Sequence, residues 1–279
     1  MGRQSRLSFE FFPPREGDGI SKLLSNVVPR LQAKSPAFYS VTYGAGGTTR
    51  DGTFDTVKTL IEAGHDAAPH LSIGADSEDT VVALLQRYRD IGVRRIVALR
   101  GDVPSGLGRS LRSANAQALV ALIRGNFGDY FQLEVAAYPE IHPDATSPDS
   151  DLDYFADKVA AGANSAITQY FYSPYAYYDF RERCSRRGLD LPIHVGIMPI
   201  TGVESIVRFS AKAGADIPRW MLKKLDSLAH DDEAVRDFGC DVCTRLCEDL
   251  HAEGAPGFHF YTLNRWGATR RIVDRLSFL

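Results

Sequence analysis

Several features of specialised proteins are missing from this chain of 279 residues. Its four cysteines are too few for a disulfide scaffold, and no apolar run approaches the roughly 18 residues that cross a membrane. The segment after Met1 leads into a strand-like run and does not resemble an export signal. These absences predict a cytoplasmic protein.

An excess of charge of one sign is also missing. The 32 Lys and Arg residues oppose 35 Asp and Glu residues, which gives a net charge of −3, and the basic residues occur as scattered pairs. A nucleic-acid or anionic-membrane binder would carry a basic patch or stripe. The composition therefore predicts small-molecule ligands, with no nucleic-acid and no membrane partner.

Three of the four cysteines, Cys240, Cys243 and Cys247, lie close together in the sequence. A Cys-x-x-Cys pair can bind zinc, but no second Cys or His pair follows at zinc-finger spacing. Residues 231–254 are typical of one amphipathic helix, on which spacings of three and seven place the thiols on one face. We expect small core residues here, and no metal site.

Glycines end helix-like stretches at regular intervals, where a left-handed cap is expected. They are Gly64, Gly92, Gly162, Gly188, Gly214 and Gly254. Strand-like runs alternate with these helices at 7–11, 38–42, 69–71, 95–99, 133–138, 165–168, 193–197 and 258–261. Such alternation indicates a parallel sheet, and about eight units in roughly 250 residues is the size of a closed (β/α)₈ barrel. We expect a single barrel domain over residues 1–279.

An open, doubly wound sheet is the competing interpretation of the same alternation. It is weakened because no Gly-x-Gly-x-x-Gly follows the first strand. A barrel places its chemistry just after the carboxyl ends of its strands. Polar or small residues occur at these points, namely Glu10, 42–47, His70, 100–102, 138–142, Gln169, 198–199 and 264–265. We expect them to converge on one rim.

Glu10 stands between phenylalanines at the end of the first predicted strand. Desolvation there should raise its pKa and make the carboxyl a usable proton donor near neutral pH. A structural carboxylate paired with an arginine is an equally open interpretation. No second carboxylate of the glycosidase type stands out.

The tripeptide Arg100-Gly101-Asp102 presents a cation, a flexible residue and an anion at a strand end. This combination suits a ligand with both phosphate and ring nitrogens, and the small residues at 104–108 are able to approach such a ligand or to act as a lid. His70 and His142 lie on the same rim without a third ligand at a recognisable spacing. Hydrogen bonding to a cofactor is therefore favoured over a metal site.

Aromatic residues concentrate at 170–178, directly after the sixth predicted strand. Packing at a strand-helix junction, or a subunit contact, is favoured over direct stacking on a ligand. Phe209 lies inside a predicted helix and, on its own pattern, reads as a core residue.

Seven segments in this order carry a more specific signal than any one of them. They are SFEFFPP (8–14), VTYGA (41–45), AAPHL (67–71), IVALRGD (96–102), VAAYPEIHP (135–143), GANSAITQ (162–169) and FHFYTLNR (258–265). From Leu7 to about Arg265, the chain closely resembles the bacterial methylenetetrahydrofolate reductases.

The resemblance implies a flavin-dependent (β/α)₈ barrel that reduces 5,10-methylenetetrahydrofolate to 5-methyltetrahydrofolate. Bound FAD would take electrons from NADH or NADPH in a ping-pong cycle, within a homo-oligomer. In that family the glutamate of the first motif is the general acid that opens the folate ring to an iminium, which implies this role for Glu10. The aspartate at Asp102 would tune the flavin and favour the cationic iminium.

Further roles are implied residue by residue. Thr42 and Gln169 fall at nicotinamide or folate contacts, Phe209 at an aromatic that packs on both, and Arg265 at a folate contact. The implied flavin contacts are Tyr43, Ala45, His70, Arg100, Gly101, Asp102, Ala116, Tyr138, His142, Asp151 and Lys158. The chain departs from the family pattern at Tyr154, Asp157 and Ser205, where Asn, Arg and Gln are expected.

Two other functions stay open at this point. One is a flavin-free reductase on the same barrel, which moves hydride directly from nicotinamide to folate, and the other is a folate- or flavin-binding barrel without turnover. The motifs extend almost to Leu279. We therefore expect no regulatory domain of the eukaryotic kind, and no inhibition by adenosylmethionine.

Overall fold

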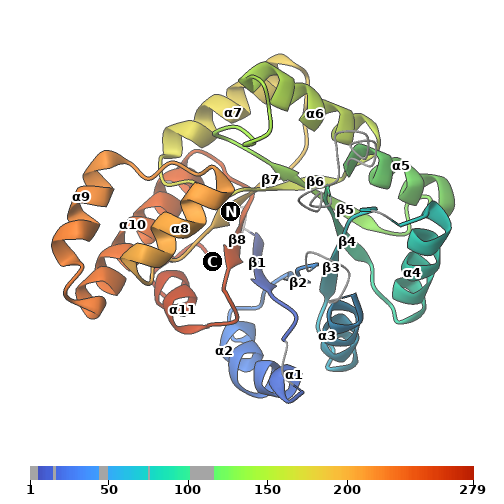
Figure 1. Ribbon diagram of the computed structural model, residues 1–279, viewed down its shortest axis with the longest axis horizontal. Coiled ribbons are helices and arrows are strands. Elements are labelled where there is room, and N and C mark those ends of the chain that lie inside the picture. Colours follow the sequence, from blue (N-terminus) through green and yellow to red (C-terminus); the bar gives the residue numbers. More distant parts are fainter. Residues whose placement is uncertain (1–5, 15–16, 44–49, 75, 101–115) are drawn as a thin grey trace.

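Strands and helices alternate along the chain, and the strands close into a barrel in sequence order (Figure 1). The computed structural model describes residues 6–14, 17–43, 50–74, 76–100 and 116–279. Within these ranges all strand pairs are parallel, and β1 pairs with both β2 and β8. The strands are β1 (Arg6–Phe11), β2 (Phe38–Val41), β3 (Ala67–Leu71), β4 (Arg95–Ala98), β5 (Gln132–Ala137), β6 (Ser165–Thr168), β7 (Ile193–Ile197) and β8 (Gly257–Tyr261).

Helices form the outer layer around these strands (Figure 1). They are α1 (Gly19–Lys22), the π-helical turn η1 (Leu23–Val27), α2 (Val28–Gln32), α3 (Arg50–Glu62), α4 (Glu78–Asp90), α5 (Ala116–Phe127), α6 (Pro148–Ala160), α7 (Pro174–Arg186), α8 (Val203–Ala213), α9 (Arg219–Leu228), α10 (Asp232–Ala252) and α11 (Gly267–Val273). The predicted closed (β/α)₈ barrel is confirmed, because β8 returns to β1 and leaves no open sheet.

The glycines that punctuate the sequence have the conformation expected of them. All six have a positive φ, for example 113° at Gly162 and 69° at Gly214, which is the C-cap of α8. A residue with a Cβ rarely adopts this region, whereas glycine enters it without penalty. These helix ends therefore lie where the glycine pattern predicts them, and the chain then continues into a strand, except after Gly214, where it continues into α9 (Arg219–Leu228).

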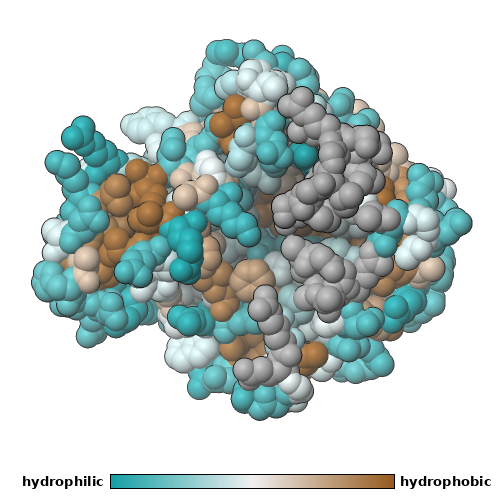
Figure 2. Space-filling view, viewed as in Figure 1, coloured by the Kyte–Doolittle hydropathy of each residue, from teal (hydrophilic) through white to brown (hydrophobic). Residues whose placement is uncertain are grey.

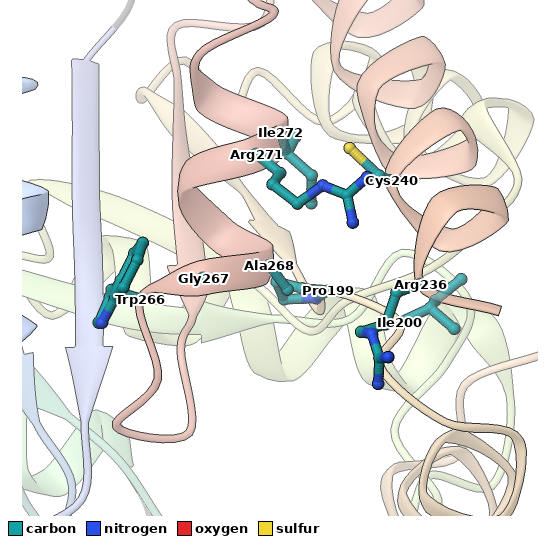
Figure 3. A pocket seen from close by; sticks show the side chains of 9 residues that line it. All are labelled: Pro199, Ile200, Arg236, Cys240, Trp266, Gly267, Ala268, Arg271 and Ile272. Carbon is teal, nitrogen blue, oxygen red and sulfur yellow. The ribbon is translucent and has the colours of Figure 1, made fainter. Parts of the chain in front are cut away.

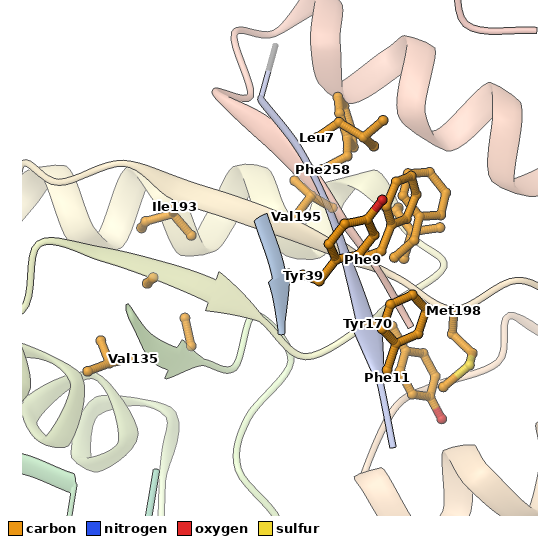
Figure 4. Close-up of a cluster of buried hydrophobic side chains, with 14 of the residues drawn as sticks. Leu7, Phe9, Phe11, Tyr39, Val135, Tyr170, Ile193, Val195, Met198 and Phe258 are labelled. Carbon is orange, nitrogen blue, oxygen red and sulfur yellow. The ribbon is translucent and has the colours of Figure 1, made fainter. Parts of the chain in front are cut away.

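The two faces of the strands differ in character. In β1, Phe9 and Phe11 are buried in the main apolar core, where Phe11 stacks on Tyr39 with the ring centroids 5.3 Å apart (Figure 4). Ser8 and Glu10 alternate with them and both contact His259 of β8. Because successive strand residues point to opposite faces, the apolar set packs under the helices and the polar set faces the barrel interior.

A buried ion pair lies inside the barrel near the start of β4. Arg95 pairs with Glu134 of β5, and the Oγ of Ser165 donates to the other Glu134 oxygen at 2.5 Å. The guanidinium also lies 4.6 Å from the ring centroid of Phe38. Both charged side chains are almost fully buried, so each depends on the other for compensation.

The cysteine cluster belongs to the core, as predicted. Cys240, Cys243 and Cys247 are buried on α10, and all are free thiols. Burial raises the pKa of Cys243 to about 12, which keeps this thiol protonated and unreactive at neutral pH. Among the helices in the described ranges, none combines the length and apolar character needed to span a bilayer.

Candidate functional site

A cavity of about 420 Å³ opens at the carboxyl ends of the strands. Its lining residues come from β1, β3, β4, β5, β6 and β8, from the segments that follow β1, β2, β4, β5, β6, β7 and β8, and from α8. The lining includes many of the predicted site residues, namely Glu10, Thr42, Tyr43, His70, Tyr138, Gln169 and Phe209. Closure of the barrel thus brings together residues from nearly the whole length of the chain, from Glu10 to Leu263.

Glu10 lies at the centre of a chain of polar side chains. Its Oε2 is 3.3 Å from Nε2 of His70 and 3.5 Å from Nε2 of His259. The other ring nitrogen of His259 lies 2.7 Å from the Oγ of Ser8. The Glu10 side chain is only 12% exposed, so these neighbours replace most of its contact with water.

The charge state expected for Glu10 is wrong. Burial does raise its pKa, but the charge of His70 and hydrogen bonds from His259 and His70 outweigh burial and lower the pKa to about 2. The partners are also histidines, where the structural interpretation supposed an arginine. In the ligand-free pocket the carboxyl is therefore ionised at neutral pH, and a proton for the reaction has to be held by the cluster as a whole.

A second polar cluster lies beside β5 and includes several predicted flavin contacts. The ammonium of Lys158 donates to the carbonyl of Ala136 at 2.5 Å, and burial lowers its pKa to about 8 although Asp151 opposes this. The Asp151 carboxylate accepts a hydrogen bond from the backbone N–H of His142 at 3.0 Å. The His142 ring meets Tyr138 edge-on, with centroids 4.5 Å apart.

Another wall of the pocket comes from the segment after β6 and from α8. Gln169 accepts a hydrogen bond from the backbone N–H of Tyr170 at 3.0 Å. Phe209 is half-buried on α8, where it packs against the apolar core, as its own pattern predicts, and also lines the pocket. Tyr170 also lines the cavity, although the sequence favoured a packing role for the tyrosine-rich run.

Other predicted residues lie away from this cavity or outside the described residues. Arg100 is partly exposed and lies 3.3 Å from Asp144, while Ala116 is buried at the start of α5. Arg265 is exposed and does not line the pocket. The predictions at Ala45, Gly101 and Asp102 fall outside the described residues.

The three departures from the expected pattern lie on α6 and α8. Tyr154 and Asp157 are exposed on α6, on the same helix as Asp151 and Lys158. Ser205 donates its hydroxyl to the carbonyl of Gly202 at 2.9 Å, within the first turn of α8. This short side chain is occupied locally, so it contributes less reach toward the pocket than a glutamine would.

Sequence reasoning gave no role to His259 and Tyr261, which both line the pocket from β8. The Tyr261 hydroxyl donates to the carbonyl of Thr168 at 2.7 Å, and burial raises its pKa well above the usual range. The alternation of polar with aromatic residues in Phe258–Tyr261 was the available signal. It places His259 and Tyr261 on the same face as Ser8 and Glu10 across the barrel seam.

A smaller cavity of about 300 Å³ lies on the outer side of the segments that follow β7 and β8. Its lining is mostly apolar, with Ile200 and Trp266 among the walls and with Arg236 and Arg271 reaching in from α10 and α11 (Figure 3). Among the predicted site residues that the structure describes, none lines it. The chemistry described above therefore belongs to the barrel mouth.

Comparison with known proteins agrees with this arrangement. The family model described as methylenetetrahydrofolate reductase matches residues 2–277. The chain is 41% identical over 272 residues to the 5,10-methylenetetrahydrofolate reductase of Pectobacterium carotovorum subsp. carotovorum, covering 97% of this chain and 90% of that protein. It is 40% identical over 275 residues to the enzyme of Escherichia coli (strain K12), covering 98% and 91%.

A solved structure gives independent support for the fold. A protein from Clostridium thermocellum, described as binding two copies of 5-methyl-5,6,7,8-tetrahydrofolic acid, superposes with a TM-score of 0.66 at 16% identity and covers 97% of this chain and 94% of its own. At that identity the likeness concerns the fold alone. The match to the family model and the two bacterial relatives, together with the barrel fold, show that this chain belongs to the methylenetetrahydrofolate reductase family.

Proposed function

We propose that this reductase converts 5,10-methylenetetrahydrofolate to 5-methyltetrahydrofolate with a resident FAD that is reduced by NADH or NADPH. The observation that carries the proposal is Glu10, which is held between two imidazoles at the mouth of the barrel. Reduction of the methylene bridge needs a proton as well as a hydride. This cluster is suited to hold that proton beside the folate.

The residues near β5 fit a flavin that carries anionic phosphates. Lys158 supplies a partly buried cation, and His142 and Tyr138 form an aromatic edge beside the pocket. Nε2 of His70 lies 3.3 Å from Oε2 of Glu10, and both residues line the pocket, so a ligand bound there would meet this pair. Bound here, a flavin supplies the hydride chemistry that links nicotinamide oxidation to folate reduction.

The protein's own part in the second half of the cycle is proton transfer and charge stabilisation. The proton held by the cluster of Glu10, His70 and His259 passes through the Glu10 carboxyl to a folate nitrogen, which opens the bridging ring to the iminium. His259 and His70 supply or hold this proton, and Ser8 orients the His259 ring through its contact with Nδ1. The ionised carboxylate left behind then faces the cationic iminium and stabilises it until hydride arrives.

The opposite wall of the pocket positions the nicotinamide and the folate, which bind there alternately. Gln169 presents its amide from the end of β6, and Phe209 presents a ring face from α8. Both are assigned here to the nicotinamide and folate that bind alternately, with Thr42 at the end of β2. Arg265, exposed beyond β8, is assigned to the carboxylate end of the folate.

An absorbance spectrum of the purified protein tests this proposal. We expect a yellow protein whose flavin bands bleach when NADH or NADPH is added without oxygen, because the nicotinamide reduces the resident flavin. Boiled protein should release the flavin into solution, which serves as the control for its identity. Colourless protein that reduces the folate would overturn the flavin assignment and select direct hydride transfer.

We also propose a cytoplasmic protein that assembles with copies of itself. Support comes from large apolar side chains that remain exposed on neighbouring helices, namely Val207 on α8 and Trp220 on α9. Figure 2 shows an apolar area in this region of the surface. Exposed apolar patches of this kind commonly mark contacts between proteins.

A further inference from the structure

Glu140, in the segment that follows β5, has no part in the proposed chemistry, yet it joins two separate parts of the site. Its Oε2 accepts a hydrogen bond from the backbone N–H of Asp216 at 2.9 Å. Asp216 lies just beyond α8, the helix that places Phe209 and Lys212 in the pocket wall. The hydrogen bond therefore ties α8 to the segment that carries Tyr138 and His142.

Two further contacts hold α8, one against the segment after β5 and one against the end of β6. A Cβ added at Gly214, the C-cap of α8, would lie 2.7 Å from Cγ of Pro143, so the end of the helix packs directly on this segment. The hydroxyls of Tyr170 and Ser210 lie 3.3 Å apart and join α8 to the end of β6. Together these contacts fix the C-terminal end of α8.

The backbone beside Glu140 is also unusual. Ile141 has φ of 143°, a region that a β-branched residue rarely enters. Such a conformation persists only where neighbouring contacts hold it. Such contacts lie on both sides of Ile141 in the sequence. The Glu140 carboxylate accepts from the Asp216 N–H, and the His142 N–H donates to the Asp151 carboxylate.

We infer that Glu140 is a positioning residue that latches α8 onto the segment after β5 and thereby sets where Phe209 and Lys212 stand in the pocket wall. The inference rests on the proposed function only for the identity of the ligands that Phe209 meets. The latch itself is a property of the protein without ligands.

The environment of Glu140 makes the latch sensitive to pH. Burial raises its pKa to about 7; the hydrogen bond from the Asp216 N–H opposes this rise, and the Asp216 carboxylate adds to it. The tyrosines after β6, Tyr170 and Tyr172, are near enough for the Glu140 charge to act on their hydroxyls. The raised pKa means that the latched form prefers the protonated carboxyl.

The sign of the effect follows from linkage. An unlatched, solvated Glu140 would titrate at its ordinary pKa of 4.5, whereas the latched group titrates at about 7. The stabilisation of the latched form is therefore fully present below the ordinary glutamate pKa of 4.5 and is lost as pH rises through about 7. We expect α8 to be held more firmly in mild acid than in mild base.

Hydrogen exchange of the α8 amides tests the latch without any ligand. After correction for intrinsic rates, exchange in the wild type should be about tenfold faster at about pH 8.5 than at about pH 5.5. Glu140→Gln keeps an acceptor oxygen and cannot ionise, so its α8 should stay protected at both pH values. Glu140→Ala should lose the protection at both.

The variant Asp216→Asn tests whether the exchange transition depends on the ionisation of Glu140, which a merely structural role for Glu140 would not require. It keeps the backbone donor and removes the nearby negative charge, so the pKa of Glu140 should fall and the exchange transition should shift to lower pH. Glu182→Gln, on the exposed face of α7, is the matched control and should match the wild type. An unchanged transition in Glu140→Gln or in Asp216→Asn would overturn the latch.

Steady-state kinetics then separates the latch from the proposed function. Glu140→Ala should raise the KM for the folate about tenfold with little change in kcat, because ligand positioning is weakened and the proton donor is intact. If the wild type shows no folate reduction, the proposed function is wrong. The hydrogen-exchange experiments need no ligand, so they still test whether Glu140 holds α8. A fall in kcat at constant KM would contradict a positioning role.

Discussion

Replacing Glu10 with Gln is expected to lower the rate of 5,10-methylenetetrahydrofolate reduction by about 10²- to 10⁴-fold, the usual contribution of a positioned acid. Glutamine has nearly the shape of glutamate but cannot hold or deliver the proton. It also leaves His70 and His259 without the carboxylate that lies within 3.5 Å of both. Reduction of the flavin by NADH should survive, because that half of the cycle does not need this proton.

The two halves can be measured separately by rapid mixing without oxygen. One experiment follows loss of flavin absorbance after NADH is added, and the other follows its return after the folate is added. The control is Glu62→Gln on α3. The Glu62 carboxylate is exposed and pairs with Lys58, so this variant should leave both rates unchanged. Folate reduction at the wild-type rate in Glu10→Gln would remove Glu10 from the mechanism.

Replacing Glu134 with Gln is expected to have the largest effect on stability. The exchange leaves the guanidinium of Arg95 inside the barrel without a counter-charge, and breaking a buried pair in this way costs about 3–5 kcal/mol. Chemical denaturation with circular dichroism measures this change in the free energy of unfolding. No residue of the pocket is altered, so the activity of the folded fraction should persist.

A double variant provides the control for Glu134. Removing both charges, as in Arg95→Met with Glu134→Leu, should recover most of the lost stability, because no unpaired charge remains. A loss under about 1 kcal/mol in the single variant would place the pair among weak, solvated ones. It would contradict the view that Arg95 and Glu134 compensate each other within the barrel.

Much of the fold was predictable because its signals are local. Strand-like runs, helical periodicity and capping glycines such as Gly162 and Gly214 depend on neighbouring residues, and the structure confirms them. The position of Glu10 at a strand end was likewise predictable. Its ionisation was not, since the two histidines that lower its pKa come from β3 and β8 and meet it only when the barrel closes.

The site was predictable where motifs lie at strand ends and less so where helices contribute. Phe209 alone looks like a core residue, because helical periodicity does not tell which apolar side chain faces a cavity. The Glu140 contact is harder still, as it joins a loop side chain to the backbone of Asp216, and a backbone donor leaves no mark in the sequence. The assignment of Asp102 stays a prediction.

The most direct test of the proposed mechanism is the return of flavin absorbance when NADH-reduced protein meets 5,10-methylenetetrahydrofolate without oxygen. We predict that the absorbance recovers fully and that one 5-methyltetrahydrofolate forms for each flavin reoxidised. Flavin that stays reduced, or product that forms while the absorbance does not change, would contradict a cycle in which a resident flavin carries the hydride and Glu10 delivers the proton.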